Sequence, residues 1–258
     1  MQDFKFKKKL GQNFLKNKQI IEKIVTSIAP TEKDLILEIG PGAGAITKEL
    51  KRYNCKLIAF EIDKETYEFL KPLEDDKTKV VYEDFLEIDL NEYLKNEVYD
   101  KLYIIGNLPY YITTAILEKI MDSGIKHETV TIMIQKEVAD RFTASPKTKE
   151  YGYMTVILNY WYDIKKITKV SSNDFIPKPK VDSAVVQLIL NKKSSIELEK
   201  FKKLIKECFQ FKRKTLNNNI KSYDKKNIEK ILNRHGYSLQ NRAEEIALNA
   251  YIEIVKSI

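Results

Sequence analysis

The segment Leu35-Ile-Leu-Glu-Ile-Gly-Pro-Gly-Ala-Gly44 joins a short buried strand to a glycine-rich turn. A helix over Ala45–Lys51 follows, with Ile46 and Leu50 on its inner face. Glycines between a strand and a helix let backbone amides approach a ligand at the positive end of that helix. This segment therefore predicts an α/β fold with a ligand site at the turn.

Further strands and helices alternate along the chain after this segment. Helical spacing predicts a helix over Thr113–Ser123, and short apolar runs predict strands over Leu57–Phe60, Lys79–Tyr82, Leu102–Ile105 and Thr129–Ile134. Such alternation indicates a parallel, doubly wound sheet whose ligands bind outside the carboxyl ends of the strands. We expect one crevice at this edge to be lined by Leu15, Gly40, Glu61, Asp84 and Asn107.

The glycine turn alone leaves two types of cofactor open. The pattern Gly-x-Gly-x-x-Ala over residues 40–45 fits a nicotinamide fingerprint, and Glu61, about 20 residues beyond, could accept ribose hydroxyls of either cofactor. The polar residues Asp84 and Asn107 favour S-adenosylmethionine, since no partner for hydride transfer accompanies them. The two histidines of the chain lie outside the expected crevice.

A second turn, at the end of the fourth predicted strand, carries groups suited to chemistry. Its sequence is Gly106-Asn-Leu-Pro-Tyr110, and Gly106 lets the backbone leave the sheet toward a ligand. Asn107 offers an amide oxygen as acceptor, while Pro109 fixes its own backbone and holds Leu108 extended. The carbonyl oxygens of Leu108 and Pro109, with the ring of Tyr110, then suit a planar group that carries an exocyclic amine. An ordinary strand-to-helix turn with a capping Asn and a packed Tyr is the alternative interpretation.

The ends of this expected domain also show recognisable patterns. Lys5–Lys9 form a basic arm, and apolar residues at helical spacing predict a helix from Ile20 to Ile28. A helix is also expected over Gln135–Ala144. Extended segments over Ile164–Val170 and Ala184–Leu190 are expected to close the sheet as an antiparallel pair.

Charge is unevenly distributed along the chain. The net charge of +8 comes from residues 191–258, which hold 16 basic and 8 acidic side chains, whereas residues 1–190 hold 29 of each. A basic appendage suggests a polyanionic partner such as nucleic acid, although an AT-rich genome also enriches lysine. We expect a catalytic domain at 1–190 and, after a linker over Asn191–Ser195, a small basic helical domain at 191–258.

Composition narrows the class of protein further. The chain has 258 residues and 43% apolar content, enough for a well-buried core, but no apolar run near the ~20 positions of a membrane span. Its two cysteines, Cys55 and Cys208, match neither a zinc spacing nor a redox pair. These features predict a cytoplasmic globular protein without a membrane association or a metal site.

Nine short motifs occur in a fixed order: LGQNFL (10–15), EIGPGAG (38–44), FEID (60–63), EDFL (83–86), GNLPYYI (106–112), QKEVADR (135–141), FIPKPKVDSAVV (175–186), KRKTL (212–216) and RAE (242–244). As an ordered set spanning nearly the whole chain, they resemble the KsgA-type ribosomal RNA small-subunit adenine dimethyltransferases. The resemblance implies a class I methyltransferase (Rossmann-like) fold and S-adenosylmethionine as methyl donor. It also implies two neighbouring adenines near the 3′ end of small-subunit rRNA, within a pre-assembled ribosomal particle, as acceptors.

The same resemblance implies roles for individual residues. The donor would be bound by Asn13, Leu15, Gly40, Glu61, Asp84 and Asn107. Catalysis would use Asn107, Leu108, Pro109 and Tyr110, with Phe175 stacking on the target base opposite Tyr110. The adenine N6 must become more tetrahedral before it attacks, so carbonyl acceptors rather than a strong base would assist it. One departure is Tyr111, where many members of the family carry Asn.

Two other functions remain open at the level of sequence. The sister family that methylates large-subunit rRNA and confers macrolide resistance shares the NLPY-type turn and the F-x-P-x-P-K-V stretch, but KRKTL and RAE favour the small-subunit family. A non-catalytic ribosome-assembly factor would keep the fold and lose activity, and the complete turn at Asn107–Tyr110 argues against this. We expect a monomer.

Overall fold

The computed structural model describes residues 6–7, 10–191 and 198–258, and the statements below concern these residues. Of the basic arm, Lys7 is described, whereas Lys5, Lys8 and Lys9 lie outside the described residues. The interval expected to be a linker also lies outside them, apart from Asn191.

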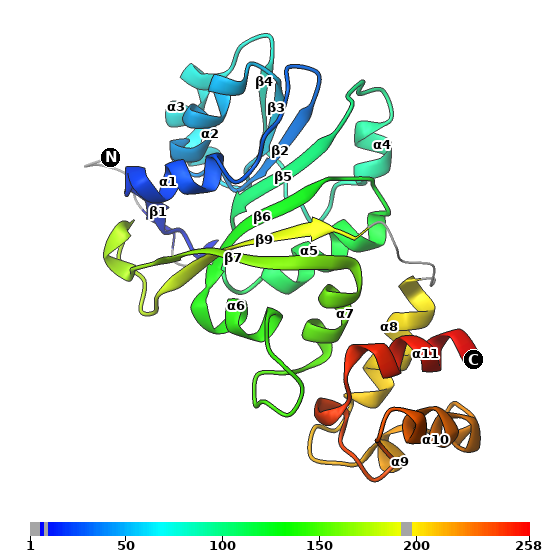
Figure 1. Cartoon of the computed structure of the whole chain (residues 1–258). Helices are drawn as coiled ribbons and strands as arrows, with labels where there is room; N and C mark the ends of the chain where they lie inside the picture. Colours follow the sequence, from blue (N-terminus) through cyan, green and yellow to red (C-terminus); the bar gives the residue numbers. More distant parts are fainter. Residues whose placement is uncertain (1–5, 8–9, 192–197) are drawn as a thin grey trace. The chain divides into compact units, whose positions relative to one another are not determined.

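The strands and helices follow the expected alternation (Figure 1). The strands are β1 (Phe14–Leu15), β2 (Leu35–Ile39), β3 (Lys56–Phe60), β4 (Thr78–Val81), β5 (Leu102–Asn107), β6 (Thr129–Gln135), β7 (Tyr162–Val170), β8 (Phe175–Ile176) and β9 (Ser183–Leu190). The α-helices are α1 (Lys18–Val25), α2 (Ala45–Leu50), α3 (Tyr67–Leu70), α4 (Leu90–Leu94), α5 (Thr113–Ser123), α6 (Lys136–Phe142), α7 (Tyr153–Trp161), α8 (Leu198–Cys208), α9 (Leu216–Asn219), α10 (Lys225–Arg234) and α11 (Leu248–Ser257). None of the helices among the described residues is long and apolar enough to cross a membrane.

The main sheet has the strand order β4-β3-β2-β5-β6-β9-β7. Strands β4 to β6 are parallel, and β9 runs antiparallel to β6. Ile39 lies opposite both Phe60 and Gly106, so the chain leaves β2, β3 and β5 at the same edge. The strand order reverses between β2 and β5, which is where open α/β sheets bind ligands. The predicted Rossmann-like fold class is confirmed.

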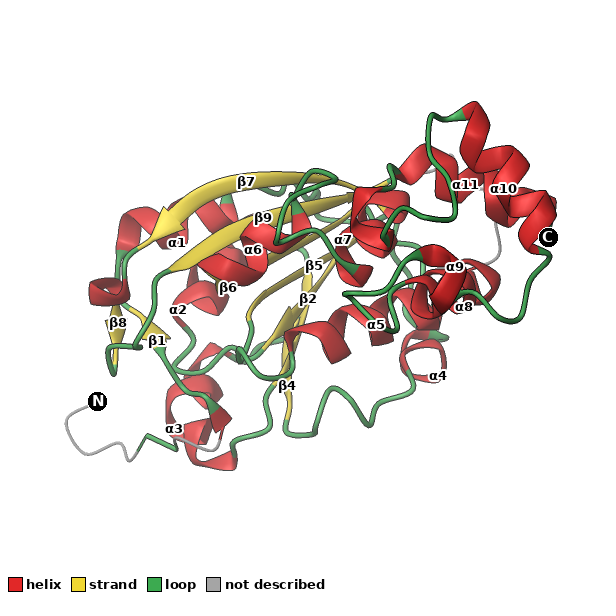
Figure 2. Ribbon diagram, turned by 90° about the horizontal axis from the view of Figure 1, so that it is seen from below, coloured by secondary structure: helices red, strands yellow, loops and turns green. Residues whose placement is uncertain are grey.

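Helices α1 and α2 cover one face of this sheet. Ile24 and Ile46 from these helices pack with Ile36, Leu57 and Ile105 in one buried cluster. Figure 2 shows α4 and α5 on the other side of the sheet. Because both faces are covered, the central strands are mostly apolar and show little alternation, as expected for a parallel sheet.

A second sheet of two short strands ties the N-terminal segment to a distant part of the chain. In it β1 runs antiparallel to β8, with Phe14 opposite Ile176 and Leu15 opposite Phe175. The Asn17 side-chain amide donates to the Asp174 carboxylate at 2.8 Å and strengthens this junction. Two-residue strands carry no periodic pattern, so the sequence did not predict this pairing.

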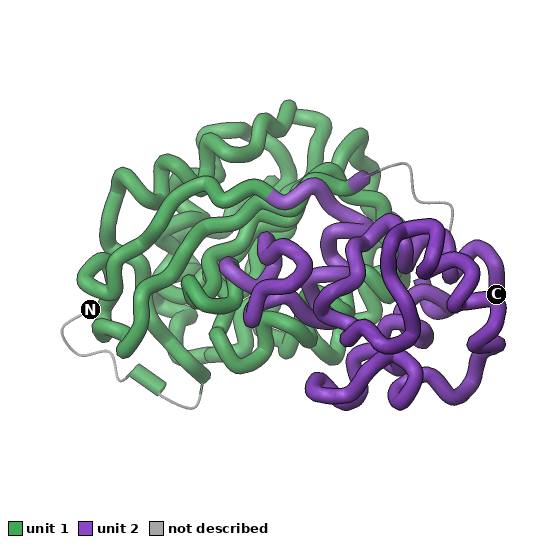
Figure 3. Tube along the Cα trace, turned by 60° about the horizontal axis from the view of Figure 1, so that its bottom comes forward, with its two compact units in different colours: residues 1–139, 165–190 green, residues 140–164, 191–258 purple. Residues whose placement is uncertain are grey.

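The chain forms two compact units whose boundaries differ from those expected at 1–190 and 191–258 (Figure 3). Unit 1 comprises residues 1–139 and 165–190, and unit 2 comprises residues 140–164 and 191–258. The difference lies in 140–164, which contains α7, a helix not predicted because its run of aromatic and β-branched residues favours strand. In unit 2, Tyr160 of α7 stacks on Phe201 of α8 with ring centroids 4.4 Å apart, which explains the grouping.

Unit 2 brings two of the diagnostic motifs together. Thr215 of KRKTL forms a β-bridge with Arg242 of RAE, and Leu216 N donates to the Asn241 carbonyl oxygen at 2.8 Å. Lys212, Arg213 and Lys214 precede this bridge in an exposed turn. The amphipathic helices α8, α10 and α11 bury their apolar faces, in agreement with the helical domain expected at 191–258.

One acidic side chain lies inside the sheet of unit 1. Glu38, in the middle of β2, is 1% exposed, and no described residue donates a hydrogen bond to its Oε2 atom. Burial, together with the charge of nearby Glu61, raises the pKa of Glu38 to about 8. Since the folded state holds this proton more tightly than the unfolded chain does, the contribution of Glu38 to stability is greatest at low pH and decreases as pH rises from 4.5 to about 8.

We therefore expect Glu38→Gln to flatten the pH dependence of stability. Over that pH interval the unfolding free energy should decrease by roughly 4 kcal/mol less in the variant than in the unmodified protein. Urea titrations at a series of pH values measure this difference, and Glu68→Gln, which changes an exposed acid of α3, is the control. Parallel curves for Glu38→Gln and the unmodified protein would contradict the assigned pKa.

Candidate active site

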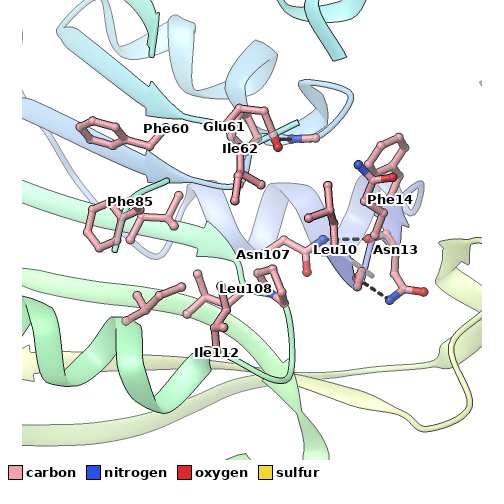
Figure 4. A pocket seen from close by; sticks show the side chains of 18 of the residues that line it. Leu10, Asn13, Phe14, Phe60, Glu61, Ile62, Phe85, Asn107, Leu108 and Ile112 are labelled. Atoms are coloured by element: carbon pink, nitrogen blue, oxygen red, sulfur yellow. Dashed lines mark hydrogen bonds between the residues drawn. The ribbon is translucent and has the colours of Figure 1, made fainter. Parts of the chain in front are cut away.

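One pocket opens at the carboxyl ends of β2, β3, β4 and β5. Its walls come from the N-terminal segment around Asn13, the glycine loop after β2, the segments after β3 and β4, and the turn after β5 (Figure 4). The residues predicted for the site that line this pocket are Asn13, Leu15, Gly40, Glu61, Asp84, Asn107, Leu108, Pro109 and Tyr110. Folding thus brings together residues from five separate stretches of sequence.

Glu61, directly after β3, is held by two backbone amides. Its Oε2 accepts a hydrogen bond from Gly42 N and its Oε1 accepts one from Asp63 N, both at 2.9 Å. The residue is 5% exposed, and burial raises the pKa of Glu61 even though these hydrogen bonds favour the charged form. A carboxylate fixed in this way keeps lone pairs that can accept hydroxyl groups of a ligand.

Gly40 and Gly42 allow the walls of the pocket to approach one another. Their φ angles are +70° and +58°, in the left-handed region that side chains disfavour. A Cβ atom at Gly42 would lie 2.9 Å from the ring of Phe14, and one at Gly40 would lie 3.5 Å from the carbonyl oxygen of Asn107. Glycine is therefore needed where the N-terminal segment and the turn after β5 pack against the loop.

The far wall combines one acid with apolar side chains. The Asp84 Oδ1 atom accepts a hydrogen bond from Leu86 N at 2.9 Å, which fixes the carboxylate at the pocket. Ile62 and Phe85 line the same wall, and Ile62 is 47% exposed (Figure 4). Neither residue is among those predicted from the sequence, although Ile62 stands between two acids, Glu61 and Asp63, directly after a strand.

Asn107, the last residue of β5, has its side chain oriented by the N-terminal segment. Its Nδ2 atom donates to the carbonyl oxygen of Asn13 at 2.9 Å, and Asn13 Nδ2 donates in turn to the Gly11 carbonyl oxygen at 3.0 Å (Figure 4). With its nitrogen engaged, Asn107 presents its amide oxygen as the atom that can accept a hydrogen bond from a ligand.

The carbonyl oxygens of Leu108 and Pro109, both expected from sequence to accept hydrogen bonds from a ligand, differ in whether they are already engaged. The Pro109 carbonyl oxygen accepts hydrogen bonds from Ile112 N at 3.2 Å and Thr113 Oγ1 at 3.3 Å, at the start of α5. The Leu108 carbonyl is thus the better placed second acceptor. The Tyr110 hydroxyl lies 2.7 Å from Ser183 Oγ, which fixes the ring beside β9.

Phe175 does not reach the pocket, in contrast to the role expected for it. It is 2% exposed and lies in the core cluster with Leu15, Val170 and Val185. The cause is the β1–β8 pairing, since alternate residues of a strand face opposite sides and the outward position is taken by Ile176. In this arrangement Phe175 packs in the cluster that holds Leu15, outside the lining of the pocket, and its expected stacking on a base opposite Tyr110 stays a prediction.

Asp63 attaches the N-terminal segment to the end of β3. Its carboxylate accepts hydrogen bonds from Lys7 Nζ at 2.6 Å and Gln12 Nε2 at 2.5 Å, and Lys7 also lies 3.0 Å from Glu65. Burial opposes ionisation of Asp63, but these partners hold its pKa below the ordinary value. The N-terminal segment is therefore anchored at two walls of the pocket, beside Glu61 after β3 and at Asn107 at the end of β5.

Removing the charge of this anchor should loosen the N-terminal segment. We expect Asp63→Asn to speed hydrogen exchange of amides in residues 10–17 by roughly 5- to 30-fold, because a charge-assisted hydrogen bond is lost. Asp75→Asn is the matched control, since Asp75 also caps backbone amides and pairs with a lysine. In the unmodified protein this protection should persist as the pH falls below 3.8, because the pKa of Asp63 is lowered. If amides in residues 10–17 exchange at the same rate in Asp63→Asn as in the unmodified protein, Asp63 does not anchor the N-terminal segment.

Comparison with solved structures defines the class of protein. A dimethyladenosine transferase from Plasmodium falciparum superposes with a TM-score of 0.80 over 95% of this chain and 96% of its own, at 23% identity, and shows the same fold. The 23S rRNA methyltransferase ErmE superposes with a TM-score of 0.72 over 95% and 98%, at 25% identity. The fold is that of the Rossmann-like methyltransferases.

Comparison of sequences identifies the family. Residues 3–258 match the family described as ribosomal RNA adenine dimethylase, and the chain belongs to this family. A ribosomal RNA small subunit methyltransferase A from Mycoplasma mobile is 43% identical over 251 residues, which cover 95% of each chain. A protein of the same name from Clostridium botulinum is 37% identical over 256 residues, covering 96% of this chain and 92% of its own. The resemblance drawn from the motifs is confirmed.

Proposed function

We propose that this enzyme transfers methyl groups from S-adenosylmethionine to N6 of two adjacent adenines near the 3′ end of small-subunit rRNA. The observation that carries the proposal is the hydrogen bond from Asn107 Nδ2 to the Asn13 carbonyl, which turns the Asn107 oxygen toward the pocket. Membership of the adenine dimethylase family and the small-subunit relatives support the choice of substrate.

The residues of the pocket fit the proposed methyl donor. Glu61 would accept the two ribose hydroxyls, Asp84 would accept the exocyclic amine of the donor's adenine, and Ile62 with Phe85 would contact the faces of that ring. Gly40, Asn13 and Leu15 would border the remainder of the donor, near Asn107. Bound there, S-adenosylmethionine supplies a methyl group on a positively charged sulfur.

The turn after β5 would prepare the acceptor nitrogen. The lone pair of an adenine N6 is delocalised into the ring, so the nitrogen must become more tetrahedral to attack a methyl group. Hydrogen bonds from the amine to the Asn107 oxygen and the Leu108 carbonyl would favour that geometry. Their dipoles would also stabilise the positive charge that develops on N6. Tyr110, fixed by Ser183, would supply a face on which the base stacks.

The basic unit 2 would bind the RNA around the target. Lys212, Arg213 and Lys214 lie exposed beside the Thr215–Arg242 bridge, so their side chains can contact phosphates. The base must leave its helix to enter the pocket, and such contacts offset part of that cost. We further propose that the enzyme acts as a monomer in the cytoplasm, on a pre-assembled ribosomal particle.

The alternative substrate is large-subunit rRNA, which the name of ErmE indicates for that protein. The decisive experiment offers the purified enzyme immature small- and large-subunit particles with labelled S-adenosylmethionine. We expect label in small-subunit RNA as dimethyladenosine at two adjacent positions. Label confined to large-subunit RNA would replace the proposed substrate, and an absence of label in both would favour a non-catalytic assembly factor.

The donor assignment predicts that Glu61→Ala weakens S-adenosylmethionine binding by ~1.5 to 3 kcal/mol, the usual contribution of hydrogen bonds to a charged group. Because the pKa of Glu61 is raised, donor affinity of the unmodified protein should decline on acidification while the pH is still above 4.5. The variant should lack this decline. Isothermal titration calorimetry at several pH values measures both effects, and unchanged affinity in Glu61→Ala would refute the ribose contact.

The acceptor assignment predicts that Asn107→Ala lowers single-turnover methylation by ~100-fold or more, as expected for the loss of one preorganised transition-state contact. RNA affinity should change little, since this contact matters most as the amine changes geometry. Asn91→Ala, which alters an exposed asparagine of α4, is the control. A rate near that of the unmodified protein would exclude Asn107 from catalysis.

The proposed RNA contact predicts that a triple Ala variant at Lys212, Arg213 and Lys214 loses RNA affinity and keeps its turnover, the reverse of Asn107→Ala. Its binding to particles should depend less on salt, by up to about one unit of slope per lost phosphate contact, while turnover at saturating substrate persists. Triple replacement of the exposed Lys33, Lys48 and Lys101 removes equal charge from unit 1 and is the control. Filter binding across a salt series measures the slope for each variant. If both triple variants show the same salt dependence, Lys212, Arg213 and Lys214 are not the RNA contact.

A further inference from the structure

We propose that Tyr111 is a second base-binding residue, which stacks on the nucleotide next to the target adenine. This inference rests on the proposed function and extends it to the neighbouring base. It starts from the exposure of the ring, which is 62% accessible although the residue lines the pocket and follows the catalytic turn directly. An exposed tyrosine alone is ordinary on a protein surface, so its location carries the argument.

Three observations locate the Tyr111 ring at the rim of the pocket. A Cβ atom at Gly11 would lie 3.4 Å from Tyr111 Cε1, so the ring lies beside the N-terminal segment. Tyr110, the preceding residue, is instead fixed at β9 through Ser183. Among the described large hydrophobic side chains that are exposed, Tyr111 is the aromatic one that lines this pocket.

The two tyrosine rings therefore have different surroundings, Tyr110 beside β9 and Tyr111 beside the N-terminal segment, which favours contacts with two different bases. In the proposed arrangement a base inserted toward Asn107 stacks on Tyr110, whereas the largely exposed Tyr111 ring is accessible to the nucleotide next to it. A flipped adenine leaves its neighbour unstacked on one side, and an exposed aromatic ring at that point can replace the lost stacking partner. Phe175 of β8 is buried and supplies no ring to the pocket. The exposed ring of Tyr111 is therefore more important as a second aromatic surface for RNA bases.

The first test compares Tyr111→Ala, Tyr111→Phe and Tyr67→Ala in the full-length enzyme. Tyr67 is also an exposed tyrosine of unit 1, at 44%, but it does not line the pocket. With immature small-subunit particles, Tyr111→Ala should raise the half-saturating particle concentration about 5- to 150-fold, from ~1 to 3 kcal/mol per stacked base. Tyr111→Phe and Tyr67→Ala should behave as the unmodified enzyme, and affinity for S-adenosylmethionine should be unchanged in all three. Equal particle affinity, or a matching loss of donor affinity, would overturn the proposal.

A double-mutant cycle then tests which base is contacted. Particles are assembled with an abasic ribose on one side of the target adenine, and then on the other. If Tyr111 stacks on one of these bases, removing that base from the substrate should weaken binding of the unmodified enzyme but not weaken Tyr111→Ala further. Additive losses on both sides would overturn the proposal. If the unmodified enzyme methylates only large-subunit particles, the proposed substrate has failed, and the same cycle on those particles still decides the role of Tyr111.

Discussion

The hydrogen bond between the Asn107 amide and the Asn13 carbonyl links the parts of unit 1 on which the site depends. One partner ends a central strand of the sheet, and the other belongs to a segment with little regular structure of its own. The segment also reaches Asp63 through Lys7 and Gln12, and it pairs with β8 through Phe14 and Leu15. The sheet therefore supplies rigid attachment points, and the N-terminal segment completes a wall that the sheet alone does not provide.

Charge within this arrangement is controlled by burial and by backbone amides. Glu61 and Asp63 are two residues apart and both buried, yet their pKa values shift in opposite directions. Asp63 has a lysine partner and stays ionised, whereas Glu61 depends on two backbone amides. Further inside, Glu38 has no such partner at Oε2 and holds its proton most strongly. The three acids thus differ in proton affinity because they differ in burial and in the donors that face them.

The aromatic residues around the turn after β5 differ in whether they pack in the core or are accessible to a ligand. Phe175 is part of the core behind Leu15, Tyr110 is fixed at β9, and Tyr111 remains largely exposed at the rim. A motif identifies the type of each residue but does not determine which side of a two-residue strand it occupies. The β1–β8 register directs the ring of Phe175 inward, so the stacking role expected for it stays a prediction that this arrangement does not support.

The sequence by itself determined the parallel sheet, the order of its first five strands along the chain and the set of polar residues at its carboxyl edge. Local patterns suffice there, because buried strands are apolar and glycine turns follow them directly. Only the tertiary structure decided the β1–β8 pairing, the anchor at Asp63, the grouping of α7 with α8 and the different surroundings of Tyr110 and Tyr111. Each of these depends on contacts between residues far apart in the chain, and such contacts leave no periodic signal in the sequence.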